Sequence, residues 1–287
     1  MSIPSLSLGG QVALITGARR GIGEACALTF AEAGADVAVC DIVADTGELA
    51  AVADKITGLG RRCLAIRADV KQKTEVNNMV KRVVEEFSTI DILVNNAGVG
   101  VGTRGPQEHQ EGQARTGFGI LVSDDVARMI DMAEENWDRV IDTNLKSCLF
   151  CSQAVSRVMI EKGRGNIINI SSVLAYERGF TELSPYSVSK RGIVMLTEGL
   201  AAILGTHNIR VNAIAPGGIE TEMMRNVMES PERLKRVESG MLLSNRLIKP
   251  TICANVALFL ASKLSAYVTG QTIIVDAGLT LARQTGG

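Results

Sequence analysis

The sequence predicts an α/β protein built on one doubly wound parallel sheet of about seven strands, with helices on both faces. Two observations carry this prediction. Short, continuous apolar runs of strand length alternate along the chain with longer stretches of helical period. The first of these runs ends in a glycine-rich loop that leads directly into an Ala-rich helical stretch. Because strands buried on both faces read as unbroken apolar runs, the alternation indicates right-handed crossovers within a single sheet.

Each expected strand is a short apolar run between turn or helix signals. The expected strands are 12–16, 35–41, 63–68, 90–95, 165–171, 209–215 and 272–276. The early helices are expected at about 22–33, 46–59 and 73–87. No internal repeat, linker or low-complexity segment interrupts the pattern, so residues 1–287 are expected to form one domain.

The composition limits the class of protein. The chain has 287 residues, of which 46% are hydrophobic and 21% are charged, close to the averages for globular proteins. The formal net charge is −1, with no long run of one sign, so neither a nucleic-acid nor a membrane-surface partner is expected. The chain lacks an apolar run of about 18 residues and the basic start of a signal peptide. A soluble cytoplasmic enzyme is therefore expected.

The six cysteines lie mostly within apolar segments, where cysteine behaves as a small hydrophobic residue. Cys148 and Cys151 have a spacing that also occurs in metal and redox sites. No second cysteine pair accompanies them, and the chain has only two histidines. Buried structural cysteines, rather than a metal site or a disulfide, are therefore expected.

One polar, glycine-rich region, at about 99–123, departs from the alternation of strands and helices. It is much longer than a usual connection of about 2–6 residues. It follows an expected strand, so it should start at the carboxyl edge of the sheet, where ligands bind in this architecture. Two interpretations stay open: a tolerated surface insertion, or part of the substrate wall or of a subunit contact.

Residues 16–23, TGARRGIG, join the first strand to the first helix. Glycines let the backbone turn sharply and approach a pyrophosphate without Cβ clashes, and the helix N-terminus offers unpaired N–H groups to the phosphates. The place of the motif between strand and helix favours a dinucleotide site over a plain turn. The loop residues expected to bind the cofactor are Gly17, Arg20, Gly21, Ile22 and Gly23.

Asp41 ends the second expected strand, 18 residues beyond Gly23. An acidic residue about 20 residues beyond the glycine loop accepts hydrogen bonds from the adenine ribose in this architecture. Such a carboxylate repels a 2′-phosphate, so NAD is favoured over NADP. Arg19 and Arg20 argue for NADP, because a guanidinium in the loop could hold a phosphate. Asp41 carries more weight, because it would occupy the site of the phosphate itself.

Tyr186 precedes Lys190 by four residues at the start of an apolar helical stretch. Positions i and i+4 share one helix face, with Cβ atoms about 5–6 Å apart. An ammonium at that distance stabilises phenolate over phenol, so Lys190 is expected to lower the pKa of Tyr186 from about 10. The pair is then expected to exchange protons near neutral pH.

Four motifs give the chain its resemblance to the short-chain dehydrogenase/reductase family, which it resembles over nearly its whole length. They are the glycine loop, Asn95-Asn96-Ala97-Gly98 after the fourth strand, Tyr186-Ser187-Val188-Ser189-Lys190, and Pro216-Gly217-Gly218-Ile219-Glu220-Thr221 after the sixth strand. The resemblance implies a Rossmann-fold dehydrogenase domain with a mobile substrate lid at about 220–245. It also implies a homotetramer packed through the helices that carry Asn144 and Tyr186.

The resemblance completes the expected cofactor site. Its further residues are Asp69 and Val70 at the adenine, Asn96 beside the cofactor, and Ile219 and Thr221 at the nicotinamide end. Tyr186 and Lys190 would also touch the cofactor, because the family's lysine bonds the nicotinamide ribose.

The resemblance also implies a catalytic set of Asn144, Ser172, Tyr186 and Lys190. Tyr186 would exchange the alcohol proton, and Ser172 would polarise the substrate oxygen as charge develops on it. Asn144 would hold a water that relays protons from the lysine. Ser172 is preferred to Ser171 because adjacent strand residues point to opposite faces.

The leading interpretation is an oxidoreductase that transfers a hydride between NAD(H) and a small secondary alcohol or its ketone. One alternative is an NADPH-dependent ketoreductase of the acyl-carrier type, which Arg20 supports and Asp41 opposes. The other is a dinucleotide-binding protein without turnover, which the intact catalytic set opposes. No cluster of charges in the sequence identifies the substrate.

Overall fold

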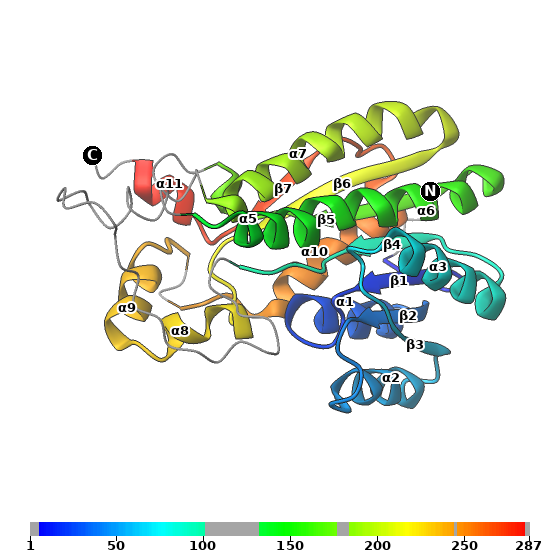
Figure 1. Ribbon diagram of the computed structural model, residues 1–287, viewed down its shortest axis with the longest axis horizontal. Helices are drawn as coiled ribbons and strands as arrows, with labels where there is room; N and C mark the ends of the chain where they lie inside the picture. Colours follow the sequence, from blue (N-terminus) through cyan, green and yellow to red (C-terminus); the bar gives the residue numbers. More distant parts are fainter. Residues whose placement is uncertain (1–5, 101–131, 177–183, 244–245, 285–287) are drawn as a thin grey trace.

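A computed structural model describes residues 6–100, 132–176, 184–243 and 246–284, and the region expected as an insertion lies almost entirely outside them. The strands are β1 Val12–Thr16, β2 Asp36–Asp41, β3 Cys63–Arg67, β4 Ile92–Asn95, β5 Gly165–Ile170, β6 Ile209–Pro216 and β7 Thr272–Val275. They form one sheet in the order β3-β2-β1-β4-β5-β6-β7, with every neighbouring pair parallel. The prediction of a parallel, doubly wound sheet of seven strands is confirmed (Figure 1).

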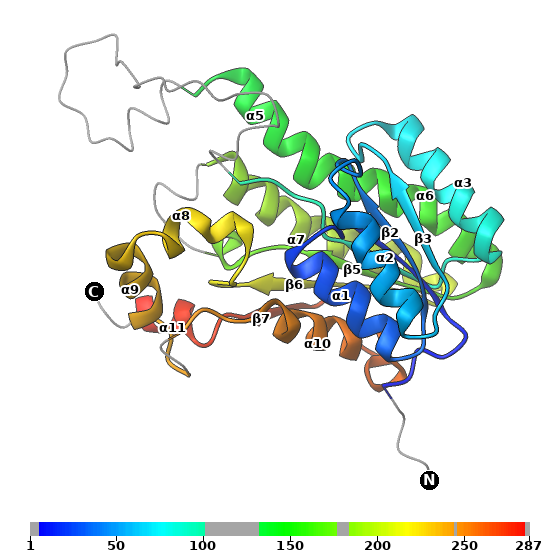
Figure 2. The same ribbon diagram turned by 90° about the horizontal axis from the view of Figure 1, so that it is seen from below.

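Helices cover both faces of this sheet. The helices of one face are α1 (Gly21–Glu32), α2 (Glu48–Gly58) and α10 (Pro250–Ala261). Those of the other face are α3 (Lys73–Phe87), α6 (Ser147–Lys162) and α7 (Pro185–Leu204). Two views at right angles show the sheet between these layers (Figure 1, Figure 2).

Strand β1 illustrates why its apolar run is unbroken. Ala13 and Ile15 belong to the half of the core that includes α1 and α10, whereas Val12 and Leu14 belong to the half that includes α3 and α6. All four side chains are buried. Because successive strand residues point to opposite faces, a strand covered on both sides needs apolar residues at every position.

The strand order reverses between β1 and β4. The chain runs outward from β1 through β2 to β3 at one edge, then returns to form β4 beside β1. In open α/β sheets, ligands bind at the carboxyl ends of the strands where the order reverses. The glycine loop after β1 and the Asn95-Asn96-Ala97-Gly98 turn after β4 therefore meet at the place where this fold binds a dinucleotide.

The helix that carries Asn144 contains a π turn. α5 (Glu134–Ile141) continues through the π segment η1 (Asp142–Lys146) into α6. Asp142 and Ser147, at the two junctions, keep right-handed helical dihedral angles, so the three segments form one continuous helix. The family resemblance implies that Asn144 interrupts its helix, and the structure has a π turn there, a geometry that occurs frequently at functional sites.

The chain after β6 extends beyond the carboxyl edge of the sheet (Figure 2). It contains η5 (Glu222–Met224), α8 (Arg225–Met228) and α9 (Pro231–Ser239). An isolated parallel bridge between Ile219 and Ile248 joins its two ends. The N–H groups of Leu242 and Leu243 donate to the Ala277 carbonyl oxygen at 2.7 and 3.1 Å, just before α11 (Leu279–Gln284). The expected lid is thus anchored at both ends, and its motion stays a prediction.

Candidate active site

The glycine loop packs against the ends of β1 and β4 with no room for larger side chains. Thr16 Oγ1 accepts hydrogen bonds from the backbone N–H groups of Asn96 and Ala97, both at 3.1 Å. The Asn96 side chain donates to the carbonyl oxygens of Thr16 and Gly17 at 3.0 and 2.8 Å. A Cβ on Gly17 would lie 2.8 Å from Ala97 Cα, and one on Gly23 would lie 2.2 Å from the Gly17 carbonyl oxygen. These two glycines are therefore required by packing, and Asn96 holds the loop in place.

Asp41 lies at the carboxyl end of β2 with its side chain 12% exposed. Its Oδ1 accepts a hydrogen bond from the Val43 N–H at 3.0 Å and lies 3.5 Å from Arg19 Nε. The Arg19 guanidinium also donates a hydrogen bond to Glu48, in the first turn of α2. One of the two arginines that argued for NADP is therefore engaged by two carboxylates.

Asp69 and Val70 follow β3 at the same edge of the sheet. The Ala68 N–H donates to the Asp41 carbonyl oxygen at 3.1 Å, which places this turn beside the end of β2. Asp69 Oδ1 accepts a hydrogen bond from the Lys71 N–H at 3.0 Å, and Val70 is buried. The structure thus brings together the three residues expected at the adenosine end of the cofactor.

The start of the expected lid packs on the glycine loop. Gly21 has φ +63°, and a Cβ on it would lie 3.3 Å from Thr221 Cγ2. Arg20 NH1 lies 3.9 Å from Glu222 Oε1. Ile219 is buried, and Ile22, the next residue of α1, packs against the core. The residues expected at the nicotinamide end therefore border the residues expected at the pyrophosphate.

The first turns of α7 place Tyr186 and Lys190. Ser184 caps the helix by accepting a hydrogen bond from the Ser187 N–H at 3.2 Å, and Pro185 occupies the first helical position, where it needs no N–H partner. Lys190 is buried, and its Nζ donates to the Ile170 carbonyl oxygen at 2.8 Å. The same Nζ lies 5.5 Å from the centroid of the Tyr186 ring. Burial lowers the pKa of Lys190 to about 8.

The pKa of Tyr186 corrects the expectation from the sequence. Burial raises this pKa above 10, and a hydrogen bond with Ser172 opposes the rise without cancelling it. The prediction that Lys190 lowers the pKa of Tyr186 is therefore wrong for this arrangement. Lys190 directs its ammonium to the Ile170 carbonyl oxygen, and desolvation of the phenolate is the largest cause of the rise.

The two serines at the end of β5 have different partners. Ser171 Oγ donates to the Lys190 carbonyl oxygen at 2.8 Å and so supports the backbone of α7. Ser172 Oγ accepts a hydrogen bond from the Leu174 N–H at 3.2 Å, and it lies close enough to Tyr186 to affect the tyrosine's pKa. Of the two, Ser172 is the one beside the phenol, as the alternation of strand residues predicts.

Asn144 is buried against the same cluster. Its Oδ1 accepts a hydrogen bond from the Val99 N–H at 2.8 Å, and its Nδ2 donates to the Val99 carbonyl oxygen at 3.1 Å and to Ser189 Oγ at 3.0 Å. A Cβ on Gly98 would lie 3.2 Å from Asn144 Oδ1 and 3.5 Å from Lys190 Nζ. The turn after β4, the π turn and α7 therefore converge on Asn144.

Three residues of the site were not among those expected from the sequence. Thr16 binds the turn after β4, and Glu48 binds Arg19. Ser189 donates a hydrogen bond to the Tyr186 carbonyl oxygen at 2.7 Å and accepts one from Asn144. Thr16 and Ser189 stand inside the motifs, so a search for hydroxyl groups beside the expected ligands would have found them. Glu48 lies in an ordinary helix start and carries no such signal.

The site fits a dinucleotide better than it fits a metal. The glycines allow backbone to approach backbone, α1 begins at the loop with unpaired N–H groups, and Arg19 Nε is buried without a hydrogen-bond partner. No group of three or more potential metal ligands occurs among the residues that the structure describes. Five of the six cysteines are buried, as expected, and all six are free thiols.

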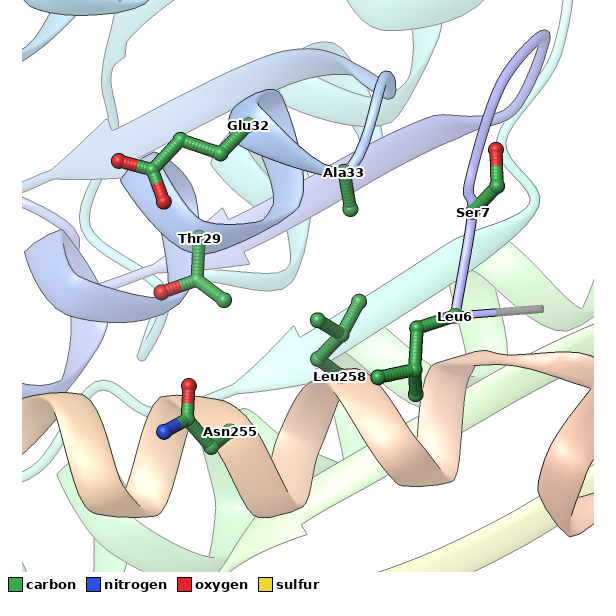
Figure 3. A pocket seen from close by; sticks show the side chains of 7 residues that line it. All are labelled: Leu6, Ser7, Thr29, Glu32, Ala33, Asn255 and Leu258. Atoms are coloured by element: carbon green, nitrogen blue, oxygen red, sulfur yellow. The ribbon is translucent and has the colours of Figure 1, made fainter.

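A shallow groove elsewhere on the surface lies between α1 and α10. Its lining residues are Leu6, Ser7, Thr29, Glu32, Ala33, Asn255 and Leu258 (Figure 3). The groove includes the C-terminal end of α1, whereas the glycine loop precedes the N-terminal end of that helix. It has none of the residues expected to act in catalysis or cofactor binding.

Known proteins resemble this chain over almost its full length. The sequence profile of the family described as short chain dehydrogenase matches residues 11–232. The 3-oxoacyl-acyl-carrier-protein reductase FabG of Chlamydia pneumoniae is 37% identical over 277 residues, which are 96% of this chain and 99% of that protein. The 2-dehydro-3-deoxy-D-gluconate 5-dehydrogenase of Dickeya dadantii is 36% identical over 279 residues, covering 97% and 98%.

Two solved structures have the same fold with different cofactors. A 7α-hydroxysteroid dehydrogenase complexed with NADH has a TM-score of 0.81 and 34% identity, covering 95% of both chains. A gluconate 5-dehydrogenase from Burkholderia cenocepacia, in complex with NADP and tartrate, has a TM-score of 0.81 and 31% identity, covering 96% and 97%. With its sheet, its glycine loop and the convergence on Tyr186 and Lys190, the chain belongs to the short-chain dehydrogenase family and is an NAD(P)-dependent oxidoreductase.

Proposed function

We propose that this enzyme transfers a hydride between NAD(H) and a secondary alcohol or the corresponding ketone. The observation that carries the proposal is the cluster at the carboxyl end of β5. Tyr186 and Lys190 share one face of α7, Ser172 lies beside the phenol, and Asn144 is buried against the same helix. A protein that only bound a dinucleotide would need no such set of proton-handling groups.

The bound nicotinamide would supply the hydride acceptor or donor. Tyr186 would take the alcohol proton in oxidation, or give it in reduction, and Ser172 would donate a hydrogen bond to the substrate oxygen as it gains negative charge. Lys190, whose pKa of about 8 lies near neutral pH, would hold the nicotinamide ribose and assist proton exchange. Asn144 would keep the turn after β4 and α7 at a fixed separation, and would hold the relay water.

Preference for NAD is supported by the adenosine end of the site. Asp41 Oδ1 is occupied by Val43 and Arg19, and its Oδ2 makes no hydrogen bond to any described residue, so it could accept from the ribose hydroxyls. A 2′-phosphate at this position would meet the Asp41 carboxylate. Gly17, Gly21, Gly23, Asp69, Val70, Ile219 and Thr221 would line the rest of the cofactor site.

A second candidate is an NADPH-dependent ketoreductase of the acyl-carrier type. It is supported by the 37% identity to the Chlamydia pneumoniae reductase and by Arg20, whose side chain is 49% exposed beside the glycine loop. Asp41 opposes this candidate. Comparing kcat/KM for NADH and NADPH with the same ketone would distinguish the two.

The proposal is tested by incubating the protein with panels of secondary alcohols and ketones and following the absorbance of the reduced cofactor. We expect NAD-dependent turnover of at least one class of secondary alcohol. Binding of NAD without turnover on any member of a broad panel would favour a role in dinucleotide binding alone.

We also propose a homotetramer that packs through α6 and α7. Met195 and Ile203 on α7 are 69% and 68% exposed, and Leu149, Phe150 and Leu200 are partly buried, whereas Cys148, Val155 and Val194 are buried in the subunit core. An apolar face on a helix of this kind suits a closed, symmetric contact. Light scattering should give the mass of four chains, and a monomer would contradict this assembly.

A further inference from the structure

The adenosine end of the site contains a carboxylate that the sequence motifs do not include. Glu48 accepts a hydrogen bond from Arg19, and Thr46 Oγ1 donates to the same Glu48 oxygen at 3.0 Å. These contacts lower the pKa of the Glu48 carboxyl, chiefly through Arg19 and then through Thr46. Glu48 is therefore an anion that binds Arg19 NH1, whereas Asp41 lies beside Nε of the same guanidinium.

We propose that Glu48 is a cofactor-specificity residue that favours NAD over NADP. It binds Arg19, the only guanidinium that contacts Asp41 within the described chain, and so prevents Arg19 from neutralising the charge of a 2′-phosphate. The inference rests on the proposed use of a nicotinamide dinucleotide. Glu48, in α2, would then discriminate between NAD and NADP together with Asp41, the residue that the sequence motifs identify.

The position of Arg19 gives the first argument. Its Nε lies 3.5 Å from Asp41 Oδ1, so the guanidinium borders the place where ribose hydroxyls, or a 2′-phosphate, would lie. That Nε is buried and makes no hydrogen bond. Arg19 therefore lies beside the place of a phosphate at the ribose, but its outer nitrogen NH1 is bound to Glu48.

The local charge gives the second argument. Arg19 contributes one positive charge, whereas Asp41 and Glu48 contribute two negative charges. Arg20, which also acts on the Glu48 carboxyl, is paired with Glu222, so the surplus of one negative charge at this end opposes a phosphate. Glu48 also lies in the first turn of α2, where the helix dipole would otherwise favour a bound anion. Replacing Glu48 by glutamine would neutralise the cluster and free Arg19 NH1, while Asp41 would remain to bind the ribose of NAD.

The test is direct binding of two adenosine fragments, 2′,5′-ADP and 5′-AMP, to the full-length protein by calorimetry. We expect Glu48→Gln to tighten 2′,5′-ADP about tenfold relative to 5′-AMP, or about 1.4 kcal/mol. The kcat/KM for NADP should rise by a similar factor, with that for NAD changed by less than about twofold. Adding Arg19→Ala to Glu48→Gln should abolish the gain.

Glu86→Gln is the matched control. Glu86 also accepts a hydrogen bond from an arginine, Arg62, and its side chain is 48% exposed, like that of Glu48. The Glu86→Gln substitution should leave the affinities for 2′,5′-ADP and 5′-AMP unchanged. An unchanged fragment preference in Glu48→Gln, or a gain that survives Arg19→Ala, would overturn the inference. If the fragments bind as expected but no alcohol is turned over, the proposed function fails and the role of Glu48 stands.

Discussion

The two halves of the carboxyl edge of the sheet hold their functional residues in different ways. At the adenosine and pyrophosphate end, after β1 and β2, Arg19 and Arg20 form ion pairs with Glu48 and Glu222, whose side chains are partly exposed. At the catalytic end, after β4 and β5, Asn144 and Lys190 are buried and bind backbone carbonyl groups.

This difference in burial separates residues that can be substituted without loss of stability from residues that cannot. Exposed ion pairs contribute about 0–1 kcal/mol to stability, whereas a buried polar group left without a partner costs about 1–3 kcal/mol. Substitutions at the adenosine end should therefore change the choice of cofactor with little effect on folding. Substitutions at the catalytic end should change turnover and stability together, unless the atom removed faces the substrate.

The largest effect is expected for Tyr186→Phe, which removes only the hydroxyl group. Turnover should fall by at least about 1,000-fold, or about 4 kcal/mol of activation free energy, while the Kd for NAD changes little. Steady-state kinetics and calorimetric titration with NAD measure the two quantities. Residual activity within about tenfold of wild type would exclude Tyr186 as the main acid and base.

Ser172→Ala and Ser171→Ala form a matched pair of adjacent residues. Ser172→Ala should lower kcat by about 100-fold, because a hydrogen-bond donor to the developing charge is lost. Ser171→Ala should leave kcat within a few-fold and lower the free energy of unfolding by about 1 kcal/mol, because only its bond to the Lys190 carbonyl oxygen is lost. Equal effects on kcat would contradict the division of roles between them.

Lys190 predicts a pH dependence of stability. Its pKa is lowered from 10.5 to about 8, so between these values the folded state binds fewer protons than the unfolded state, and stability from this group rises with pH. The unfolding free energy of wild type minus that of Lys190→Met should therefore rise from about pH 8 upward, with a limiting slope of about 1.4 kcal/mol per pH unit. Chemical denaturation at several pH values measures it. A difference that stays constant would show that burial does not penalise this ammonium.

The smallest effect on folding is expected for Asp41→Ala. The kcat/KM for NAD should fall about tenfold and that for NADP should rise, while the free energy of unfolding falls by about 1 kcal/mol or less. Asp36→Ala, at the other end of β2, is the control, because Asp36 pairs with Arg61 away from the site. Wild-type enzyme that already prefers NADP would refute the role of Asp41.

Much of this architecture could be predicted from the sequence because its signals are local. Each strand lies within two residues of its expected range, since the apolar runs and the turns that bound them are contiguous. The four motifs fall at strand ends and helix starts, and topology alone then brings them to one edge.

The remaining features depend on contacts between distant residues. Glu48 meets Arg19 across 29 positions of sequence, and no local pattern announces that contact. The direction of the Tyr186 pKa depends on how deeply the phenol is buried, which spacing on a helix does not reveal. The expected insertion near residues 99–123 stays a prediction, since it lies almost entirely outside the described residues. Shortening it should alter substrate preference while the tetramer persists.

The π turn at Asp142–Lys146 has a consequence for insertions and deletions. A π turn accommodates one more residue than an α-helical turn, so deleting a residue there can restore regular α-helical geometry. Each residue of an α-helix advances the direction of its side chains by about 100°. Because either kind of turn completes about one revolution, a deletion within the π turn would leave the directions of α5 and α6 nearly unchanged, whereas a deletion in the regular part of either helix would rotate one segment relative to the other by about 100°. The π turn is therefore the position inside this helix where loss of one residue should disturb the packing of α5 and α6 least.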